Sequence, residues 1–464
     1  MEERIRIEQL GEHVGKTVTI AGFVDVRRDH GKLVFIDLRD ESGIVQVVAK
    51  ADVLGDAKEA RNEWVLQMTG EVKERPEKLV NADEPLGHIE FGAHTISVLS
   101  TALTPPLEVN KDTSDVGEDV RLKYRYIDLR TKRMQQNLRV RSEFVRRCRE
   151  HLFTHNFTEI ETPLLTKATP EGSRDFLVPS RHNPGHFYAL PQSPQQYKQL
   201  LMGSGFENYF QVARAIRDED LRADRGFEHT QIDIEMAYVT QEMVMQRVEA
   251  MLIEAAEGLG KTIKEKPFPR ITYADAMERY GADKFDLRTD AEKEAGVLAY
   301  AWVIDFPFFE KTDEGTWTFT HNPFSMPKEE HLEWLLAGTH IEQIMTQQYD
   351  IVCNGYESGG GSIRAHRPEI LRAVYSVMGY SDAEIEASVG HMIEAFGYGI
   401  PPHGGIALGV ERNVMNLTGE EYLREVQAFP MTGSGKTAVM DAPSEASPEQ
   451  LAELGLSVTK PSQD

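Results

Sequence analysis

The sequence has 464 residues, 40% of them hydrophobic and 27% charged, which predicts two or three folded domains and excludes an intrinsically disordered chain. Its 51 basic and 75 acidic residues give a formal net charge of −24, which excludes loose nucleic-acid binding over the whole surface but not a local basic track. No apolar run approaches the roughly 20 residues that cross a bilayer, and the N-terminus lacks the apolar core of a signal peptide, so we expect a cytoplasmic protein without membrane contact.

Residues 1–103 are predicted to be all β. Runs rich in β-branched and aromatic residues at 17–26, 33–38, 44–49, 64–72 and 89–99 are separated by Gly, Asp and Ser, with a helical link near 52–61. Five such strands fit an OB-fold barrel, which commonly reads single-stranded nucleic acid. Phe35 then offers a stacking face with Arg28 and Gln46 nearby, or it is simply a buried core aromatic.

Residues 104–136 are expected to form a hinge, because Pro105 and Pro106 break the strand pattern and a polar, acidic stretch follows. A helix is predicted over 131–153, followed by a β run that ends at Pro163. Between residues 121 and 149 there are eleven basic and two acidic residues, which form either a phosphate-contacting strip or a solvated helix face. His151 and His155 lack a third ligand and are expected to be a surface pair, not a metal site.

Residues 210–236 are predicted to form a hairpin that organises a binding site. Its strands are apolar, yet Gln231, Asp233 and Glu235 alternate onto one face, and its loop 217–228 holds three arginines and five carboxylates. Polar groups are costly to bury without partners, so this face favours a phosphate-bearing ligand over a merely solvated hairpin. A helix that opens at Pro194 places Gln195 and Lys198 on one side, and 241–258 is an amphipathic helix.

The C-terminal half is predicted to alternate strands with helices. Helical segments are expected at 271–288, where the segment ends in a polar loop, and at 328–336, 368–378 and 382–396. Strands are expected at 301–309 and 351–356, the latter entering three glycines between strands. Residues 404–412 form a glycine-containing strand that starts a helix, a junction suited to phosphate. The sequence GSGKT at 433–437 is not a P-loop, because Pro430 stands where that pattern needs glycine.

The segments RDEDLRAD, TPEGSRDF, LPQSPQQYKQLL, NGYESGGGSIR and GIPPHGGIALGVER together resemble the bacterial type of aspartyl-tRNA synthetase, a class II family, over residues 6–458. The resemblance implies an α+β multidomain protein. Its parts would be an OB-fold anticodon-binding domain (1–103), a hinge (104–136), a class II catalytic domain with an antiparallel sheet flanked by helices (137–446) and a tail of unassigned role (447–464). Members act as homodimers through the first class II signature, which here ends at Pro163.

The resemblance also implies a reaction. L-aspartate is activated by ATP to aspartyl adenylate, and the aminoacyl group passes to the terminal adenosine of tRNA(Asp). Such displacements at charged centres depend on positioning and electrostatic stabilisation. Arg217 would hold the α-phosphate and Arg412 the γ-phosphate, and Asp350 with Glu357 would bind Mg2+. The ATP-binding set implied by the family is Arg217, Glu219, His229, Gln231, Glu357 and Arg412.

Free aspartate has two carboxylates and an ammonium group, so its pocket needs both signs of charge. Arg364 and Lys198 would hold the side-chain carboxylate, and Asp233 would accept from the ammonium. The full aspartate-binding set that the resemblance implies is Glu171, Ser193, Gln195, Lys198, Arg217, Asp233, His321 and Arg364. The matching anticodon-contacting positions are Arg28, His30, Phe35, Gln46 and Glu90.

Four departures from the family pattern stand out. His229 replaces the phenylalanine that stacks on adenine, from which we expect altered ATP affinity or a pH response, and Asn322 replaces a second histidine after His321. Residues 286–300 leave no room for the inserted domain of bacterial members. His30 resembles members that charge tRNA(Asn) as well as tRNA(Asp). Two alternatives remain open: an asparaginyl-tRNA ligase, and a synthetase-like RNA-binding protein without activity.

Overall fold

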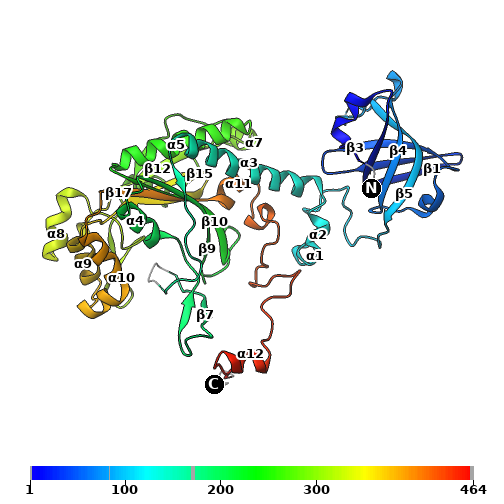
Figure 1. The fold of residues 1–464 in the computed structure, drawn as a ribbon. Helices are drawn as coiled ribbons and strands as arrows, with labels where there is room; N and C mark the ends of the chain where they lie inside the picture. The colour runs from blue at the N-terminus through cyan, green and yellow to red at the C-terminus, as the bar shows by residue number, and fades with distance from the viewer. Residues whose placement is uncertain (1–2, 83, 169–172, 460–464) are drawn as a thin grey trace. The chain divides into compact units, whose positions relative to one another are not determined.

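The computed structural model describes residues 3–82, 84–168 and 173–459 of the chain. The chain divides into two units, Met1–Arg133 and Met134–Asp464, which we describe separately (Figure 1). No helix among these described residues is long and apolar enough to cross a membrane.

The first unit is built on a closed five-stranded barrel with strand order β1-β2-β3-β5-β4. Its strands are β1 (Thr17–His30), β2 (Leu33–Arg39), β3 (Ile44–Lys50), β4 (Val65–Glu74) and β5 (Ile89–Ser100), with short 3-10 helices η1 (Ile7–His13), η2 (Gly55–Glu59) and η3 (Glu77–Leu79). Buried and partly exposed residues alternate along β2 and β3, as expected for strands with one face in a core. The predicted OB-fold barrel is confirmed.

Two short helices, α1 (Glu118–Lys123) and α2 (Arg125–Asp128), follow the barrel. Asp128 is fully buried and accepts hydrogen bonds from Arg121 Nη2 at 3.0 Å, Arg125 Nη1 at 2.7 Å and Thr113 Oγ1 at 2.6 Å. The interpretation of the basic run as a phosphate-contacting strip is wrong for these two arginines, because both are buried and neutralised by one carboxylate.

The second unit contains an eight-stranded sheet in the order β11-β12-β15-β16-β17-β10-β9-β6, antiparallel except at its two edge pairs. Its strands are β6 (Thr158–Glu159), β9 (Asn208–Ile216), β10 (Glu228–Ala237), β11 (Arg270–Thr272), β12 (Tyr300–Ile304), β15 (Gln348–Cys353), β16 (Tyr356–Ile363) and β17 (His403–Gly409). Two small hairpins, β7 (Leu177–Pro179) with β8 (Phe187–Ala189) and β13 (Phe309–Lys311) with β14 (Trp317–Phe319), lie outside it.

The helices of this unit flank the sheet, except α12, which lies apart from it near the C-terminus (Figure 1). They are α3 (Lys132–Thr154), α4 (Gln195–Gly203), α5 (Gln241–Gly258), α6 (Tyr273–Tyr280), α7 (Asp290–Glu294), α8 (Leu332–Ala337), α9 (Pro368–Val377), α10 (Asp382–Gly397), α11 (Val410–Thr418) and α12 (Pro448–Glu453). Apolar residues of α3 and α5 share one core with Ile232 and Ile234 of β10 and Ile406 and Leu408 of β17. Because strand residues alternate, the polar residues between these isoleucines point to the opposite face.

The predicted helical segment 271–288 contains the short helix α6, which ends at Gly281, whose φ of 70° suits the left-handed helix cap, and the expected loop follows. One prediction for the C-terminal half is corrected. The three glycines lie inside β16 rather than between strands. A Cβ on Gly361 would sit 2.1 Å from the carbonyl oxygen of Gly405, so glycine permits the close pairing of β16 with β17.

Candidate active site

A cavity of about 340 Å³ lies over the polar face of the large sheet. Strands β10, β16 and β17, helix α4 and the loop of the β9-β10 hairpin all contribute to its lining. Thirteen of the predicted site residues line it: Ser193, Gln195, Lys198, Arg217, Glu219, His229, Gln231, Asp233, His321, Asp350, Glu357, Arg364 and Arg412. Glu171 lies outside the described residues.

The base of the cavity is a buried network of two cations and two carboxylates. Lys198 Nζ lies 2.6 Å from Asp233 Oδ1 and 3.2 Å from Glu235 Oε2. Arg364 grips Glu235 with Nε at 2.9 Å and Nη2 at 3.1 Å. Glu235 was not predicted as a site residue, although its place on the polar face of β10 was. Its role depends on Arg364, which is distant in sequence.

Asp233 keeps one oxygen unused. Its side chain is fully buried, Oδ1 is bound by Lys198, and Oδ2 has no hydrogen-bond partner among the residues that the structure describes. Burial raises the pKa of Asp233 against the opposing charge of Lys198, whereas the pKa of Glu235 is lowered because Arg364 and Lys198 outweigh its burial. A buried acceptor of this kind calls for a charged donor from a ligand.

Glycines make room for these carboxylates. Glu235 pairs with Gly405 across β10 and β17, and a Cβ on Gly405 would lie 2.2 Å from Glu235 Oε2. Asp350 pairs with Gly360 across β15 and β16, where a Cβ would lie 2.8 Å from Asp350 Oδ1. Strand register therefore places an acid opposite a glycine at both points.

Asp350 and Glu357 are the residues predicted to bind Mg2+; of the two, only Asp350 belongs to the group of converging ligand atoms found among the described residues. Asp350 is 3% exposed, accepts a hydrogen bond from Gln348 Nε2 at 2.7 Å and has Oδ2 3.9 Å from His321 Nδ1. Its burial raises its pKa to about 7, with the nearby Glu357 charge acting in the same direction and His321 opposing it. One potential ligand atom each from Asp283, His321 and Asp350 lie within 4.8 Å of one another. Carboxylate oxygens suit Mg2+, so these residues fit the ion.

The pKa of Glu357 is shifted in the opposite direction from that of Asp350. Burial acts to raise its pKa, but Arg412 and Lys284 lower it to about 2. Lys284 Nζ lies 3.0 Å from Glu357 Oε2, and Arg412 Nη1 donates to the Glu357 carbonyl at 3.0 Å. The sequence did not predict Lys284, because no local motif links it to Glu357.

Two arginines line the cavity, Arg217 and Arg412. Arg217, at the end of β9, donates from Nε to the carbonyl of Gln192 at 3.3 Å. Arg412 lies in the first turn of α11, and its Nη2 is 3.1 Å from Asp224 of the hairpin loop. Both planar side chains can match phosphate oxygens, and the N-terminal end of α11 adds a favourable dipole for an anion.

His229 and Asn322 mark the departures from the family pattern. Burial, followed by the charges of Arg217 and Arg412, lowers the pKa of His229 to about 3, and Gln231 Nε2 donates to its Nε2 at 3.0 Å. We therefore expect an uncharged ring at neutral pH, and the altered ATP affinity stays a prediction. Asn322 Nδ2 donates to Gln348 Oε1 at 3.2 Å, so it holds the residue that bonds Asp350.

The predicted nucleic-acid residues gather on the outside of the barrel. Phe35 lies between buried Val34 and Ile36 on β2 and is itself partly exposed, so the alternative of a core aromatic is wrong. Arg28 pairs with Phe35 across β1 and β2, and the His30 ring contacts Phe35 edge-on at 5.4 Å. Gln46 and Glu90 are neighbours in the β3-β5 pair.

The histidine pair of α3 is only partly as predicted. His151 is 4% exposed, so it is not a surface residue, and its Nδ1 lies 2.6 Å from Glu254 of α5. The rings of His151 and His155 are 4.1 Å apart. The pair belongs to the packing of α3 against α5.

Comparison with known proteins gives consistent matches over both units. The family described as tRNA synthetases class II (D, K and N) matches residues 117–433, and the OB-fold nucleic acid binding domain matches residues 18–94. The aspartate–tRNA(Asp/Asn) ligase of Rubrobacter xylanophilus is 39% identical over 584 aligned positions, covering 98% of this chain and 97% of that protein. The aspartate–tRNA ligase of Bacillus licheniformis is 37% identical, covering 96% and 97%.

Solved structures share the fold at lower identity. The asparaginyl-tRNA synthetase of Pyrococcus horikoshii in complex with asparaginyl-adenylate has a TM-score of 0.74 at 22% identity, covering 93% of this chain and 99% of that chain. A putative aspartyl-tRNA synthetase of Leishmania major Friedlin has a TM-score of 0.73 at 21% identity, covering 93% and 94%.

Proposed function

Since the chain belongs to the aspartate–tRNA ligases of the class II tRNA synthetases, we propose that it activates L-aspartate with ATP and transfers it to the terminal adenosine of tRNA(Asp). The observation that carries this proposal is the buried charge network at the base of the cavity. It offers the N–H groups that Arg364 retains after binding Glu235 and Ser362, together with the Asp233 oxygen that has no hydrogen-bond partner among the described residues, as a small amino acid with an acidic side chain requires.

Aspartate recognition is assigned to Arg364, Lys198 and Asp233. Within the described chain Arg364 uses three of its five N–H groups, two on Glu235 and one on Ser362 Oγ, so one remains on each terminal nitrogen. These two N–H groups suit the side-chain carboxylate of the substrate, with Lys198 adding charge. Asp233 Oδ2 accepts a hydrogen bond from the ammonium group of the substrate, and Ser193 and Gln195, at the N-terminal end of α4, assist it.

ATP recognition is assigned to the opposite end of the cavity. Arg217 holds the α-phosphate, Arg412 the γ-phosphate, and the flat neutral ring of His229 stacks on adenine, with Glu219 and Gln231 beside it. Asp350 and Glu357 would hold Mg2+, which neutralises phosphate charge when bound. His321, which lies beside Asp350, contacts the substrates from the metal side.

The chain's own residues act by positioning. An α-carboxylate oxygen of aspartate forms a bond to the α-phosphorus while the bond from that phosphorus to the bridging oxygen breaks, releasing pyrophosphate. Arg217 stabilises the charge that develops on the α-phosphate oxygens, and Arg364 with Asp233 fixes the direction of attack. No side chain has to remove a proton, because the attacking carboxylate is already ionised.

The outer face of the barrel is assigned to the anticodon. Phe35 offers a stacking surface, while Arg28, Gln46 and Glu90 surround it with phosphate-binding and base-reading groups. We also propose that tRNA(Asn) is charged as well as tRNA(Asp), because His30 resembles the residue of members with this wider range and the Rubrobacter relative is named for both tRNAs. We further propose a cytoplasmic homodimer formed through α3 and β6, the first class II signature.

The inserted domain of bacterial relatives is proposed to be absent near residues 286–300. That stretch contains only the five-residue helix α7 before β12 begins. The alignment with the Rubrobacter relative also extends over 584 positions, more than the 464 residues of this chain.

Aspartate-dependent ATP–pyrophosphate exchange tests the proposal directly. Exchange with aspartate and little with asparagine is expected, because Arg364 would leave a neutral amide poorly compensated. Preference for asparagine would favour the asparaginyl alternative, and tight tRNA binding without adenylate formation would favour the inactive RNA-binding alternative. Charging purified tRNA(Asp) and tRNA(Asn) side by side then decides the tRNA range.

A further inference from the structure

The loop between α6 and α7 brings two charged residues to the metal end of the cavity. Lys284 Nζ lies 3.0 Å from Glu357 Oε2, and the side chains are 40% and 29% exposed. Its neighbour Asp283 supplies the third member of the group with His321 and Asp350. Consecutive residues of one loop thus face the two carboxylates that we assign to Mg2+.

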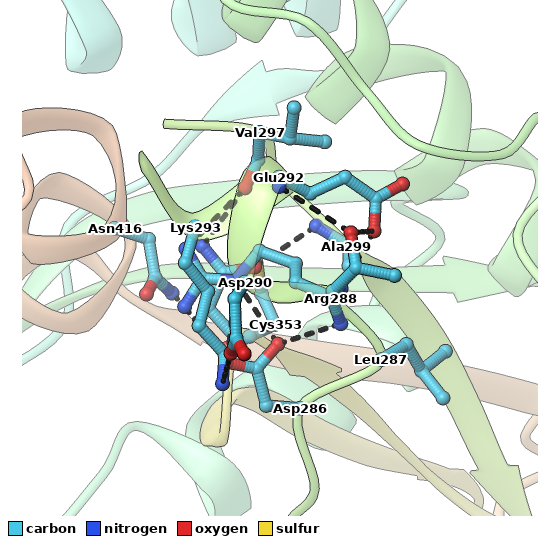
Figure 2. Close-up of polar contacts among 12 residues, drawn as sticks. Asp286, Leu287, Arg288, Asp290, Glu292, Lys293, Val297, Ala299, Cys353 and Asn416 are labelled. Atoms are coloured by element: carbon cyan, nitrogen blue, oxygen red, sulfur yellow. Dashed lines mark hydrogen bonds and ion pairs between the residues drawn. The ribbon is translucent and has the colours of Figure 1, made fainter. Parts of the chain in front are cut away.

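The loop is held in place by contacts within itself and with the segments that precede β11 and β12. Arg288 grips Asp286 with Nε at 3.0 Å and Nη2 at 2.8 Å, and its Nη1 reaches the carbonyl of Val297 at 3.5 Å (Figure 2). Lys264 Nζ donates to the Leu287 carbonyl at 2.6 Å. These contacts fix the C-terminal half of the loop.

The same loop is tied to the turn that precedes Glu357. The backbone N–H of Gly355 donates to the carbonyl of Phe285 at 3.1 Å, and the Phe285 side chain is 5% exposed. This backbone hydrogen bond joins the residue after Lys284 to the turn two residues before Glu357, and so brings the two side chains together. Their ion pair is built into the fold and is not a chance surface contact.

The ion pair conflicts with metal binding at Glu357. A divalent cation and an ammonium group at the same oxygen repel each other strongly in a partly buried site. The lysine has a flexible four-carbon stem and a partly exposed side chain, so it can move. When ATP binds together with Mg2+, its phosphates give the Lys284 ammonium group another anion to pair with.

We propose that Lys284 occupies the metal's position on Glu357 in the free enzyme and transfers to the phosphates when Mg2+ and ATP bind. It would then be a further phosphate-binding residue of aspartate activation. This inference rests on the proposed function, because it requires Glu357 to be a metal ligand and the cavity to accept ATP. The inference adds a third cation to Arg217 and Arg412. Before ATP binds, Lys284 competes with Mg2+ for Glu357; afterwards, both Lys284 and Mg2+ neutralise phosphate charge.

The test is a comparison of metal and nucleotide binding in Lys284→Met, with Mn2+ as the probe because its preference for carboxylate oxygens resembles that of Mg2+. Titration of the nucleotide-free protein, followed by electron paramagnetic resonance, should show Mn2+ binding about five- to tenfold tighter than in the wild type. Calorimetric titration with ATP and Mg2+ should show weaker binding by a similar factor. General damage to the site would weaken both.

Two control variants sharpen the result. Lys293→Met removes a nearby lysine that pairs with Asp290 on α7, and it should leave both affinities unchanged. Lys284→Arg keeps the charge and should remain near wild type. Unchanged or weaker Mn2+ binding in Lys284→Met, or unchanged ATP binding, overturns the inference.

The wild-type exchange assay separates this inference from the proposed function. Absence of aspartate-dependent exchange in the wild type would refute the function. Active wild type together with unaltered Mn2+ affinity in Lys284→Met would refute the role of Lys284 alone.

Discussion

Replacing Asp233 with asparagine tests the proposed recognition of the substrate ammonium group. The change preserves shape, and the amide oxygen can still accept from Lys198, which now lies 2.6 Å from Oδ1. The amide nitrogen, however, replaces the unused oxygen Oδ2 with a donor. The substrate ammonium group would then meet an N–H donor at the place where the wild type offers it a carboxylate oxygen.

The expected loss follows from the burial of the network. Truncating one partner of a buried, hydrogen-bonded charge pair costs roughly 2–5 kcal/mol in binding. We expect about 3–4 kcal/mol here, because the asparagine still bonds Lys198, which corresponds to roughly a 10²–10³-fold loss in kcat/KM for aspartate. The KM for ATP should change little, since Asp233 lies at the aspartate end of the cavity.

Succinate provides the decisive comparison, because it is aspartate without the ammonium group. In the exchange assay, succinate should inhibit wild type and Asp233→Asn with inhibition constants within about threefold of each other, a small fraction of the ~10²-fold aspartate effect. Equal weakening of aspartate and succinate would refute the reasoning, since it would mean that the substitution damages the pocket generally. A proportional rise in the KM for ATP would count against it in the same way.

Three further predictions concern other parts of the chain. Arg364→Lys should weaken aspartate by roughly 10²-fold and reduce the preference over asparagine in competitive exchange, because lysine cannot make the bidentate contact. His229→Phe should leave the pH dependence of ATP affinity unchanged between about pH 6 and 8. The same substitution should remove a loss of stability at low pH. The pKa of His229 falls from 6.5 to about 3 on folding, so below about pH 6.5 the proton binds the unfolded chain and favours unfolding. At pH 5 the gain over wild type should be about 1–2 kcal/mol, seen as a smaller drop in Tm between pH 7 and pH 5. Phe35→Ala should weaken tRNA(Asp) by about 1–3 kcal/mol in a filter-binding assay without altering exchange, whereas equal loss in both would indicate barrel unfolding.

The strands of the barrel and helix α5 could be predicted because their signals are local. Alternation over seven residues defines β2, and the apolar stripe and Thr240 cap define α5 at the predicted residues 241–258. The cavity-lining residues were predicted mainly through the resemblance to a class II synthetase family, whose motifs the sequence matches residue by residue. For residues 271–288 the sequence predicted a helix that ends in a loop but not the residue at which the helix ends, which is Gly281.

The partners of the charged residues could not be predicted from the sequence. Arg121 and Arg125 have the composition of an exposed basic strip, and only the fold shows that Asp128 buries them. Glu235 was recognised as polar and inward-facing, but its bond to Arg364 depends on the register of β10 with β17 and of β17 with β16. Such pairings are set by distant backbone hydrogen bonds, on which local patterns carry no information.

The pairing of charges in the cavity has a consequence for the order of binding. Each cation that we assign to a substrate is paired with a carboxylate: Lys198 with Asp233, Arg364 with Glu235, Arg412 with Asp224, Arg217 with Glu219, and Lys284 with Glu357. A buried cation without such a partner would be costly before substrate arrives. When the phosphates of ATP bind Arg412 and Lys284, these cations leave the Glu357 carboxylate, which can then bind the metal. We therefore expect Mg2+ and ATP to bind cooperatively, because ATP neutralises the two cations and Mg2+ neutralises the carboxylate that they leave.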